Sequence, residues 1–150
     1  MKWRSLLLVG LALLCSTTPL YAQVAVNPTS VSCTASADHN STSVDGAALI
    51  AKYEFRVYLE TAPNGPTMGT PLDLGKPTPL TTGCPTGVAA PCLVWTTAQV
   101  PGLFNGLAKN TKFVAKVVAL GPLGEGVSDP SNPFGFNGPP AKPGVPSVQK

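Results

Sequence analysis

The chain has 150 residues, with ten basic and seven acidic side chains and a formal net charge of +3. Because the basic residues form no stripe or run, neither nucleic acid nor an anionic membrane surface is an expected partner. Charged residues make up only 11% of the chain, while proline and glycine number 17 and 15, a balance that favours one turn-rich all-β domain over a helical protein.

The first 22 residues have the features of a secretory signal peptide. Lys2 and Arg4 form a basic start, residues 6–14 are apolar and uncharged, and Ala22 ends a cleavage-site pattern. The apolar run is shorter than the about 20 residues that a membrane-spanning helix needs, so we expect cleavage and no stable membrane insertion. Cys15 leaves a lipoprotein as an alternative, although the residue before it is large. The expected location is secreted, periplasmic or at the cell surface.

Cleavage would leave 128 residues with eight basic and seven acidic side chains. This length suffices for one domain with a core and is too short for two. We expect the domain at residues 23–136, followed by a flexible tail at residues 137–150, because four prolines in that tail prevent it from joining a central strand.

The strongest strand signal lies at residues 50–60. Every second side chain is apolar there, and most of those between are charged. This period of two matches a strand with one buried face, and the aromatic and β-branched content also favours a strand. The residues expected to face the core are Tyr53, Phe55 and Val57.

Shorter extended segments surround this strand. Residues 24–26 and 31–35 precede it, and residues 71–74 and 93–97 follow, separated by polar or Gly/Pro-rich loops. A final hairpin begins after a turn at Asn110 and returns toward Phe134. Its core residues are expected to be Phe113, Val117 and Ala119. Six or seven short strands of this kind predict an antiparallel β-sandwich.

Three cysteines remain after the predicted cleavage. Cys84 and Cys92 enclose a short loop with two prolines and one glycine, and in an oxidising compartment we expect a disulfide between them. Cys33 lies in an alternating segment and is interpreted as a small buried apolar residue. Three cysteines and one histidine lack paired ligand spacing, so no zinc site and no cofactor are expected.

Two patterns resemble the fibronectin type III family. Ile50-x-x-Tyr53-x-Phe55-x-Val57 resembles that family's third strand. The segment before and within the family's sixth strand is similar to Leu107-x-x-x-Thr111-x-Phe113-x-x-x-Val117-x-Ala119. The loop into the family's last strand is similar to the segment that contains Gly121, Gly124 and Ser128. The resemblance covers about residues 31–136 and implies an immunoglobulin-like antiparallel β-sandwich of six to seven strands.

Two positions depart from the family pattern. Ala35 stands where the family's second strand usually carries tryptophan, and Phe113 replaces the usual corner tyrosine. Trp95, on another strand, is a candidate to fill the missing volume. No Arg-Gly-Asp sequence is present, so integrin-type adhesion is not implied.

The polar loop at residues 36–48 holds the few candidates for catalysis or metal binding. His39, the one histidine, has Ser41 and Asp38 or Asp45 as formal triad partners, but neighbours in one flexible loop rarely form a preorganised triad. Asp38, Asn40 and Asp45 offer oxygen ligands for calcium, although Asp and Asn are more often turn formers. We therefore expect no catalytic residue and no metal site. Asn40 also begins a glycosylation sequon, Asn-Ser-Thr.

The charged face of residues 50–60 is the other candidate surface. Glu54 and Glu60 lie six residues apart on this face and raise the idea of a glycosidase pair, but a solvated sheet face explains them better. Tyr58 is expected to be exposed beside Lys52, Glu54 and Arg56, a candidate contact surface that an ordinary exposed strand explains better.

The function favoured by these observations is a secreted, non-enzymatic binding or structural module whose loops or edge strand contact a protein or glycan. One alternative is an accessory domain of the carbohydrate-binding type or a small secreted hydrolase. Another is a subunit of an extracellular surface assembly that pairs through an edge strand.

Overall fold

The computed structural model describes residues 23–139, which form an all-β structure without a helix in that range. The predicted signal peptide, residues 1–22, and residues 140–150 of the predicted tail lie outside the described residues. No helix in the described part of the chain is long and apolar enough to cross a membrane.

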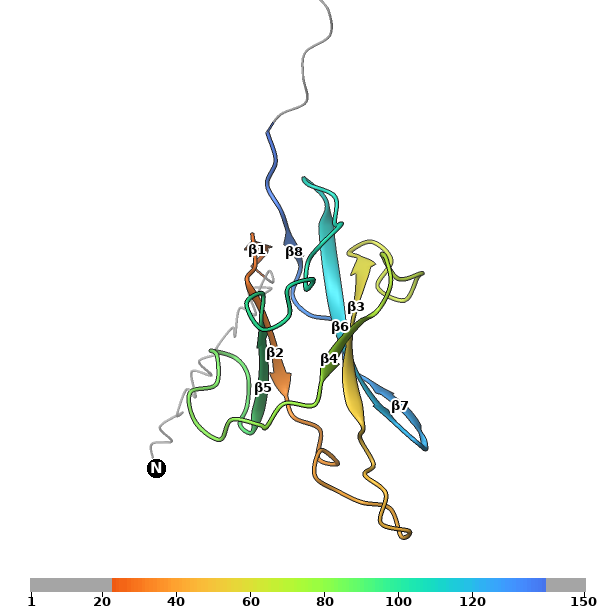
Figure 1. Cartoon of the computed structure of the whole chain (residues 1–150). Helices are drawn as coiled ribbons and strands as arrows, with labels where there is room; N and C mark the ends of the chain where they lie inside the picture. The colour runs from red at the N-terminus through yellow and green to blue at the C-terminus, as the bar shows by residue number, and fades with distance from the viewer. Residues whose placement is uncertain (1–22, 140–150) are drawn as a thin grey trace, which may run out of the picture.

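Within residues 23–139, eight strands form two sheets (Figure 1). The larger sheet has the order β1-β8-β6-β3-β4, with β7 also paired to β6, and the smaller sheet is β2-β5. The strands are β1 (Ala25–Val26), β2 (Ser30–Thr34), β3 (Lys52–Leu59), β4 (Leu72–Gly75), β5 (Cys92–Thr96), β6 (Lys112–Gly121), β7 (Gly124–Val127) and β8 (Phe134–Gly135).

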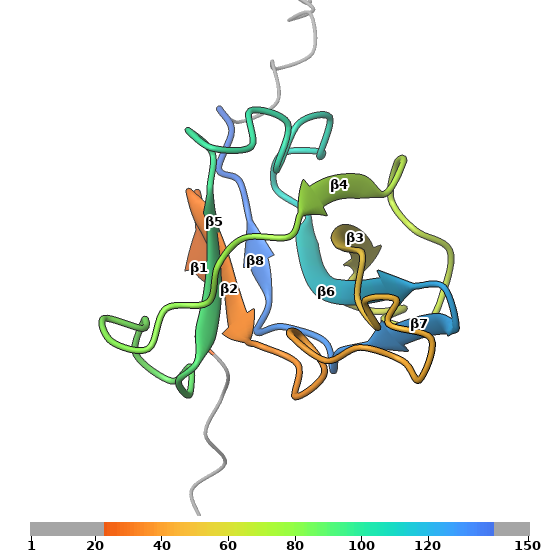
Figure 2. The same cartoon turned by 60° about the horizontal axis from the view of Figure 1, so that its bottom comes forward.

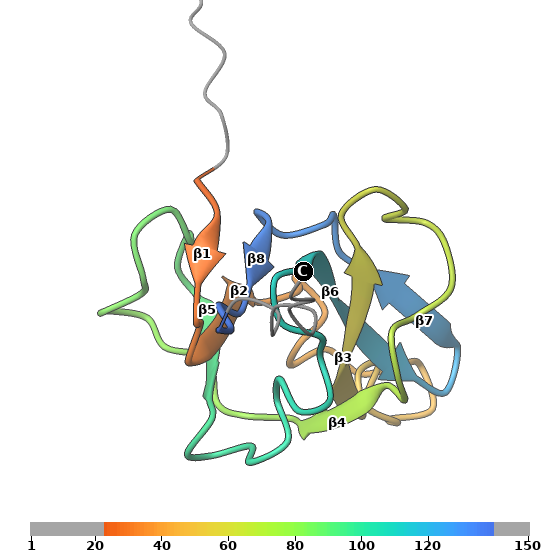
Figure 3. The same cartoon turned by 90° about the horizontal axis from the view of Figure 1, so that it is seen from above.

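Strands β3 and β6 form the centre of the larger sheet. They pair antiparallel over the whole length of β3, from Lys52 opposite Leu120 to Leu59 opposite Phe113. Both strands lie within segments that the alternation of apolar residues predicted. At the start of the described residues, β1 pairs with β8 in parallel and so joins the larger sheet instead of pairing with β2 (Figure 3).

The last strand is divided, which explains why eight strands are present where six or seven were predicted. β7 and β8 pair with the same strand, β6, on either side of Asp129-Pro130. Proline has no N–H to donate to a ladder. Two serines continue the pairing: Ser128 and Ser131 accept hydrogen bonds through Oγ from the N–H groups of Val117 and Ala115, each at 3.0 Å.

Figure 2 shows the β2-β5 pair across from β6 and β3 of the larger sheet, and the core cluster takes side chains from both sheets. All six residues predicted to face inward belong to it or pack against it: Tyr53, Phe55, Val57, Phe113, Val117 and, partly buried, Ala119. Trp95 joins them from β5. It is 2% exposed, and its Nε1 donates a hydrogen bond to the carbonyl oxygen of Leu74 at 2.9 Å. This indole therefore ties the smaller sheet to β4 of the larger one.

Substituting Gly121 with alanine is expected to lower the free energy of unfolding by about 1–3 kcal/mol. A Cβ atom there would collide with the carbonyl oxygen of Leu49, a backbone atom that cannot rotate away. The matched control is Gly126→Ala on the adjacent β7, where a Cβ meets no atom within 4 Å. Urea unfolding of both variants tests this, and equal midpoints would contradict it.

Candidate functional site

Three connections gather at one end of the molecule. They are residues 35–51 between β2 and β3, residues 76–91 between β4 and β5, and the short β6–β7 turn (Figure 1, lower end). We call this set the loop end. Its two long loops are held in place by different contacts, a small hairpin in the first and a disulfide in the second.

The first long loop contains a small hairpin. Thr42 pairs with Ala48, the N–H of Leu49 donates to the carbonyl of Ser41 at 2.9 Å, and Gly46 makes the turn with φ +83°. The Asp45 carboxylate accepts a hydrogen bond from the Ser43 hydroxyl, which lowers its pKa. Asp45 thus stabilises the turn of this hairpin through its hydrogen bond with Ser43. Within residues 23–139, no group of three or more His, Cys, Asp or Glu side chains could hold a metal ion.

His39 anchors the base of this loop to the core. Its side chain is 5% exposed, its Nδ1 lies 2.9 Å from the Tyr53 hydroxyl, and the two rings stack with centroids 5.7 Å apart. Burial, and secondarily the positive charge of Lys76, lower the pKa of His39. Among the described residues, no hydrogen bond joins His39 to Ser41, Asp38 or Asp45, so the formal triad is not assembled.

Stability is expected to fall as the pH drops from 7.5 to about 5.5, because of His39. Its pKa is lowered in the fold, so the unfolded chain binds the proton more readily. The His39 contribution is therefore complete above the unfolded pKa, about 6.5, and is lost as the pH falls through that value toward the folded pKa.

Denaturant midpoints at several pH values would measure this loss, with His39→Gln as the variant that abolishes it. Asp45, Asp73 and Glu125 have lowered pKa values, and their protonation changes the free energy of unfolding only below about pH 5. Equal pH dependence in wild type and His39→Gln would contradict the assignment.

The second long loop is closed by the predicted disulfide between Cys84 and Cys92, with Cα atoms 5.9 Å apart. Leu80 adds a second closure, because its N–H and carbonyl exchange hydrogen bonds with those of Cys92 at 2.8 and 2.9 Å. Most residues of the segment 81–91 are exposed. We call this segment the stapled arch, since it is fixed at its base and contributes little to the core.

A hollow of about 570 Å³ separates the two loops. His39 and Asn40 line one side and Thr78, Thr81 and Pro91 the other, and no acidic or lysine or arginine side chain takes part. A second hollow, of about 360 Å³, lies between the first loop and the β6–β7 turn. The loop end is thus concave on both sides of the His39 loop.

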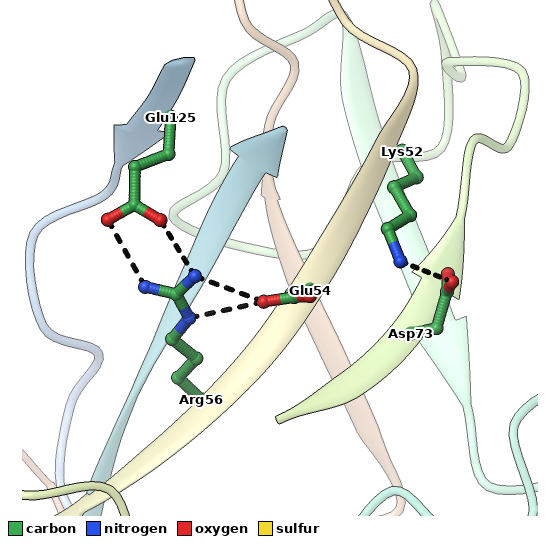
Figure 4. Close-up of polar contacts among 5 residues, drawn as sticks. All are labelled: Lys52, Glu54, Arg56, Asp73 and Glu125. Atoms are coloured by element: carbon green, nitrogen blue, oxygen red, sulfur yellow. Dashed lines mark hydrogen bonds and ion pairs between the residues drawn. The ribbon is translucent and has the colours of Figure 1, made fainter. Parts of the chain in front are cut away.

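The charged side chains on the outer face of β3 form ion pairs (Figure 4). Arg56 places Nη1 and Nη2 on the two carboxylate oxygens of Glu125 at 3.3 and 2.8 Å, while its Nε and Nη2 donate to Glu54 at 3.3 and 3.0 Å. Lys52 pairs with Asp73 at 2.8 Å. These contacts join β7, β3 and β4, and they leave Glu54 paired rather than poised opposite Glu60.

Two exposure predictions need correction. Tyr58 is 8% exposed, so the prediction of an exposed contact tyrosine is wrong: the ammonium of Lys116 lies over its ring at 5.1 Å from the centroid. Cys33 is partly rather than fully buried and packs against the core as a free thiol. Burial raises the pKa of this thiol to about 11, so it stays protonated near neutral pH.

No protein-family model, curated protein or solved structure matches this chain.

Proposed function

We propose that this chain is a non-enzymatic binding module on an immunoglobulin-like β-sandwich of the fibronectin type III kind, acting outside the cytoplasm. The strand order supports the fold: β3 and β6 are neighbours, β4 and the divided last strand flank them, and β2-β5 forms the opposite sheet. β3 and β6 are the segments that resemble the family's third and sixth strands. The disulfide supports an oxidising compartment, as does the predicted signal peptide.

The observation that carries the proposed binding function is the construction of the loop end. A hydrogen-bonded hairpin and a disulfide-closed arch hold two long loops on either side of a hollow. Loops that are ordered before binding lose less conformational entropy when a ligand arrives. Such loops on a rigid scaffold are a common form of binding site.

A protein ligand is favoured over a glycan. Glycan sites need exposed aromatic rings as platforms, and none of the Trp, Tyr or Phe side chains within residues 23–139 is exposed. The hollow between the loops instead offers hydroxyl, amide and proline groups without a formal charge at neutral pH. These groups suit an uncharged, polar protein surface.

The hydrolase alternative has less support. The single histidine uses Nδ1 on the Tyr53 hydroxyl, and that hydroxyl belongs to a side chain only 2% exposed. A general base needs a nucleophile within hydrogen-bond reach, and Ser41 is not bonded to His39.

The test begins with capture of a partner on the immobilised protein from the native extracellular fraction. Binding of that purified partner is then compared between wild type and a variant in which residues 86–89 of the stapled arch are replaced by Gly-Gly. The matched control shortens the loop between β3 and β4, at the opposite end, by the same length. We expect about tenfold or greater weakening in the arch variant alone.

Unchanged affinity in the arch variant would move the binding surface elsewhere. Binding to an immobilised glycan array through the same arch would replace the protein ligand with a glycan. Hydrolysis of an ester, peptide or glycan panel that disappears in His39→Ala would overturn the non-enzymatic proposal.

A further inference from the structure

One edge of β2 carries main-chain groups without partners in residues 23–139. The N–H of Thr97 donates to the carbonyl of Thr29, and the N–H of Ala35 donates to that of Pro91. Along a strand, the N–H and C=O groups of successive residues point alternately to one neighbouring strand and to the opposite side. The main-chain groups of residues 29, 31, 33 and 35 therefore point toward β5. Residues 30, 32 and 34 therefore direct three N–H and three C=O groups away from β5.

The outer edge of β5 is partly protected, whereas the outer edge of β2 is not. On the outer side of β5, Leu80 pairs with Cys92, and the Gln99 side chain accepts from the N–H of Thr96. Proteins protect edges with charges, prolines, bulges or covering segments. β2 reads Ser-Val-Ser-Cys-Thr, without a charge or a proline, and its register with β5 has no bulge.

Two hollows follow this edge between the sheets. The first, of about 140 Å³, is lined by Val31 and Phe134, and the second, of about 320 Å³, by Cys33 and Val117. Val31 and Cys33 are two positions apart on one strand, a separation of about 6–7 Å. That is the spacing of side chains i and i+2 on a neighbouring strand. No charged side chain lines either hollow.

We propose that the β2 edge is a strand-addition site for an extended, uncharged segment of a partner protein. The segment pairs its main chain with Ser30, Ser32 and Thr34, and two apolar side chains at i and i+2 enter the hollows. This mode gives affinity through main-chain bonds and specificity through alternate side chains. It does not depend on the loop end.

The far wall of the hollows favours a single strand over a second copy of the chain. Ala25 beside β8 and Ser128, Ser131 and Asn132 of the divided last strand form that wall. A lone segment needs only the space in front of the edge. A second copy would bring its own opposing wall, formed by β1 and the divided last strand, against the same wall of the first.

The test uses two uncharged peptides of sequence Ser-Thr-Val-Thr-Val-Thr-Ser with blocked ends, one N-methylated on both valines and the other on the three threonines. The N–H groups of alternate residues lie on opposite edges of a strand, so each peptide can pair along one edge only. We expect one peptide to bind and the other to bind about tenfold or more weakly, in titrations to about 1 mM. The readout is the amide NMR signals and slowed hydrogen exchange of Ser30, Ser32 and Thr34.

Protein variants locate the site independently. Ser32→Pro removes an outward N–H on the open edge and should abolish peptide binding. Val94→Pro, directly opposite on β5, removes an N–H that points to the other side of the sheet and should leave binding intact. Melting curves of both show whether either variant has lost its fold, and the peptide pair tests the site without any variant.

Three results would overturn the proposal. Binding of neither peptide, or peptide binding that Ser32→Pro leaves unchanged, would exclude pairing along this edge. A wild-type dimer in sedimentation experiments that Ser32→Pro dissociates would make a second copy the occupant. Slow hydrogen exchange of Ser30, Ser32 and Thr34 in the free monomer would show that the chain already covers this edge itself.

Discussion

Truncating Phe55 to alanine is expected to lower the free energy of unfolding by about 3–5 kcal/mol. Phe55 is 3% exposed at the centre of β3, and its ring meets that of Phe104 edge to face, with centroids 5.7 Å apart. Truncation removes the buried apolar surface and leaves a cavity. A domain of this size has a total stability of about 5–15 kcal/mol, so the variant would lose a large part of it.

Urea unfolding followed by tryptophan fluorescence measures this effect, since the indole of Trp95 belongs to the same core cluster. Val44→Ala is the control, because Val44 is fully exposed at the tip of the small hairpin and its loss should change stability by less than about 0.5 kcal/mol. A Phe55→Ala protein that unfolds at the wild-type midpoint would mean that β3 does not bury this face.

The inner faces of β3 and β6 could be predicted because their signal is local. Alternation at residues 50–60 places Tyr53, Phe55 and Val57 on one face whatever the rest of the chain does. The disulfide was equally local, since Cys84 and Cys92 are eight residues apart.

The outer face of β3 was not predictable in the same way. Tyr58 alternates with apolar residues and is expected in solvent, yet Lys116 of the neighbouring strand lies over its ring. Arg56 pairs with Glu125, 69 residues further on. Long charged side chains cover apolar surface with their stems, and only the strand register brings these partners together.

The loop end and the open edge depend on contacts between distant segments. The polar sequence around His39 indicates a flexible loop, whereas its contact with Tyr53 across 14 residues orders it. In the sequence, the only feature that pointed to this contact was a single histidine 14 residues before an inward-facing tyrosine. The β2 edge is open because β1 pairs with β8 instead of β2, a choice that strand propensity does not determine.

Removing the disulfide by Cys84→Ala and Cys92→Ala is expected to cost about 2–3 kcal/mol, the chain-entropy value for so short a loop. Dithiothreitol should lower the wild-type unfolding midpoint toward that of the double variant and leave the variant unchanged. Cys33→Ala serves as the control, because this thiol is unpaired and dithiothreitol should lower the midpoint of that variant as it does in wild type. Hydrogen exchange should quicken in residues 81–91 and stay slow at Phe113, which is fully buried. Equal midpoints with and without reductant would show that the fold, rather than the bond, holds the arch.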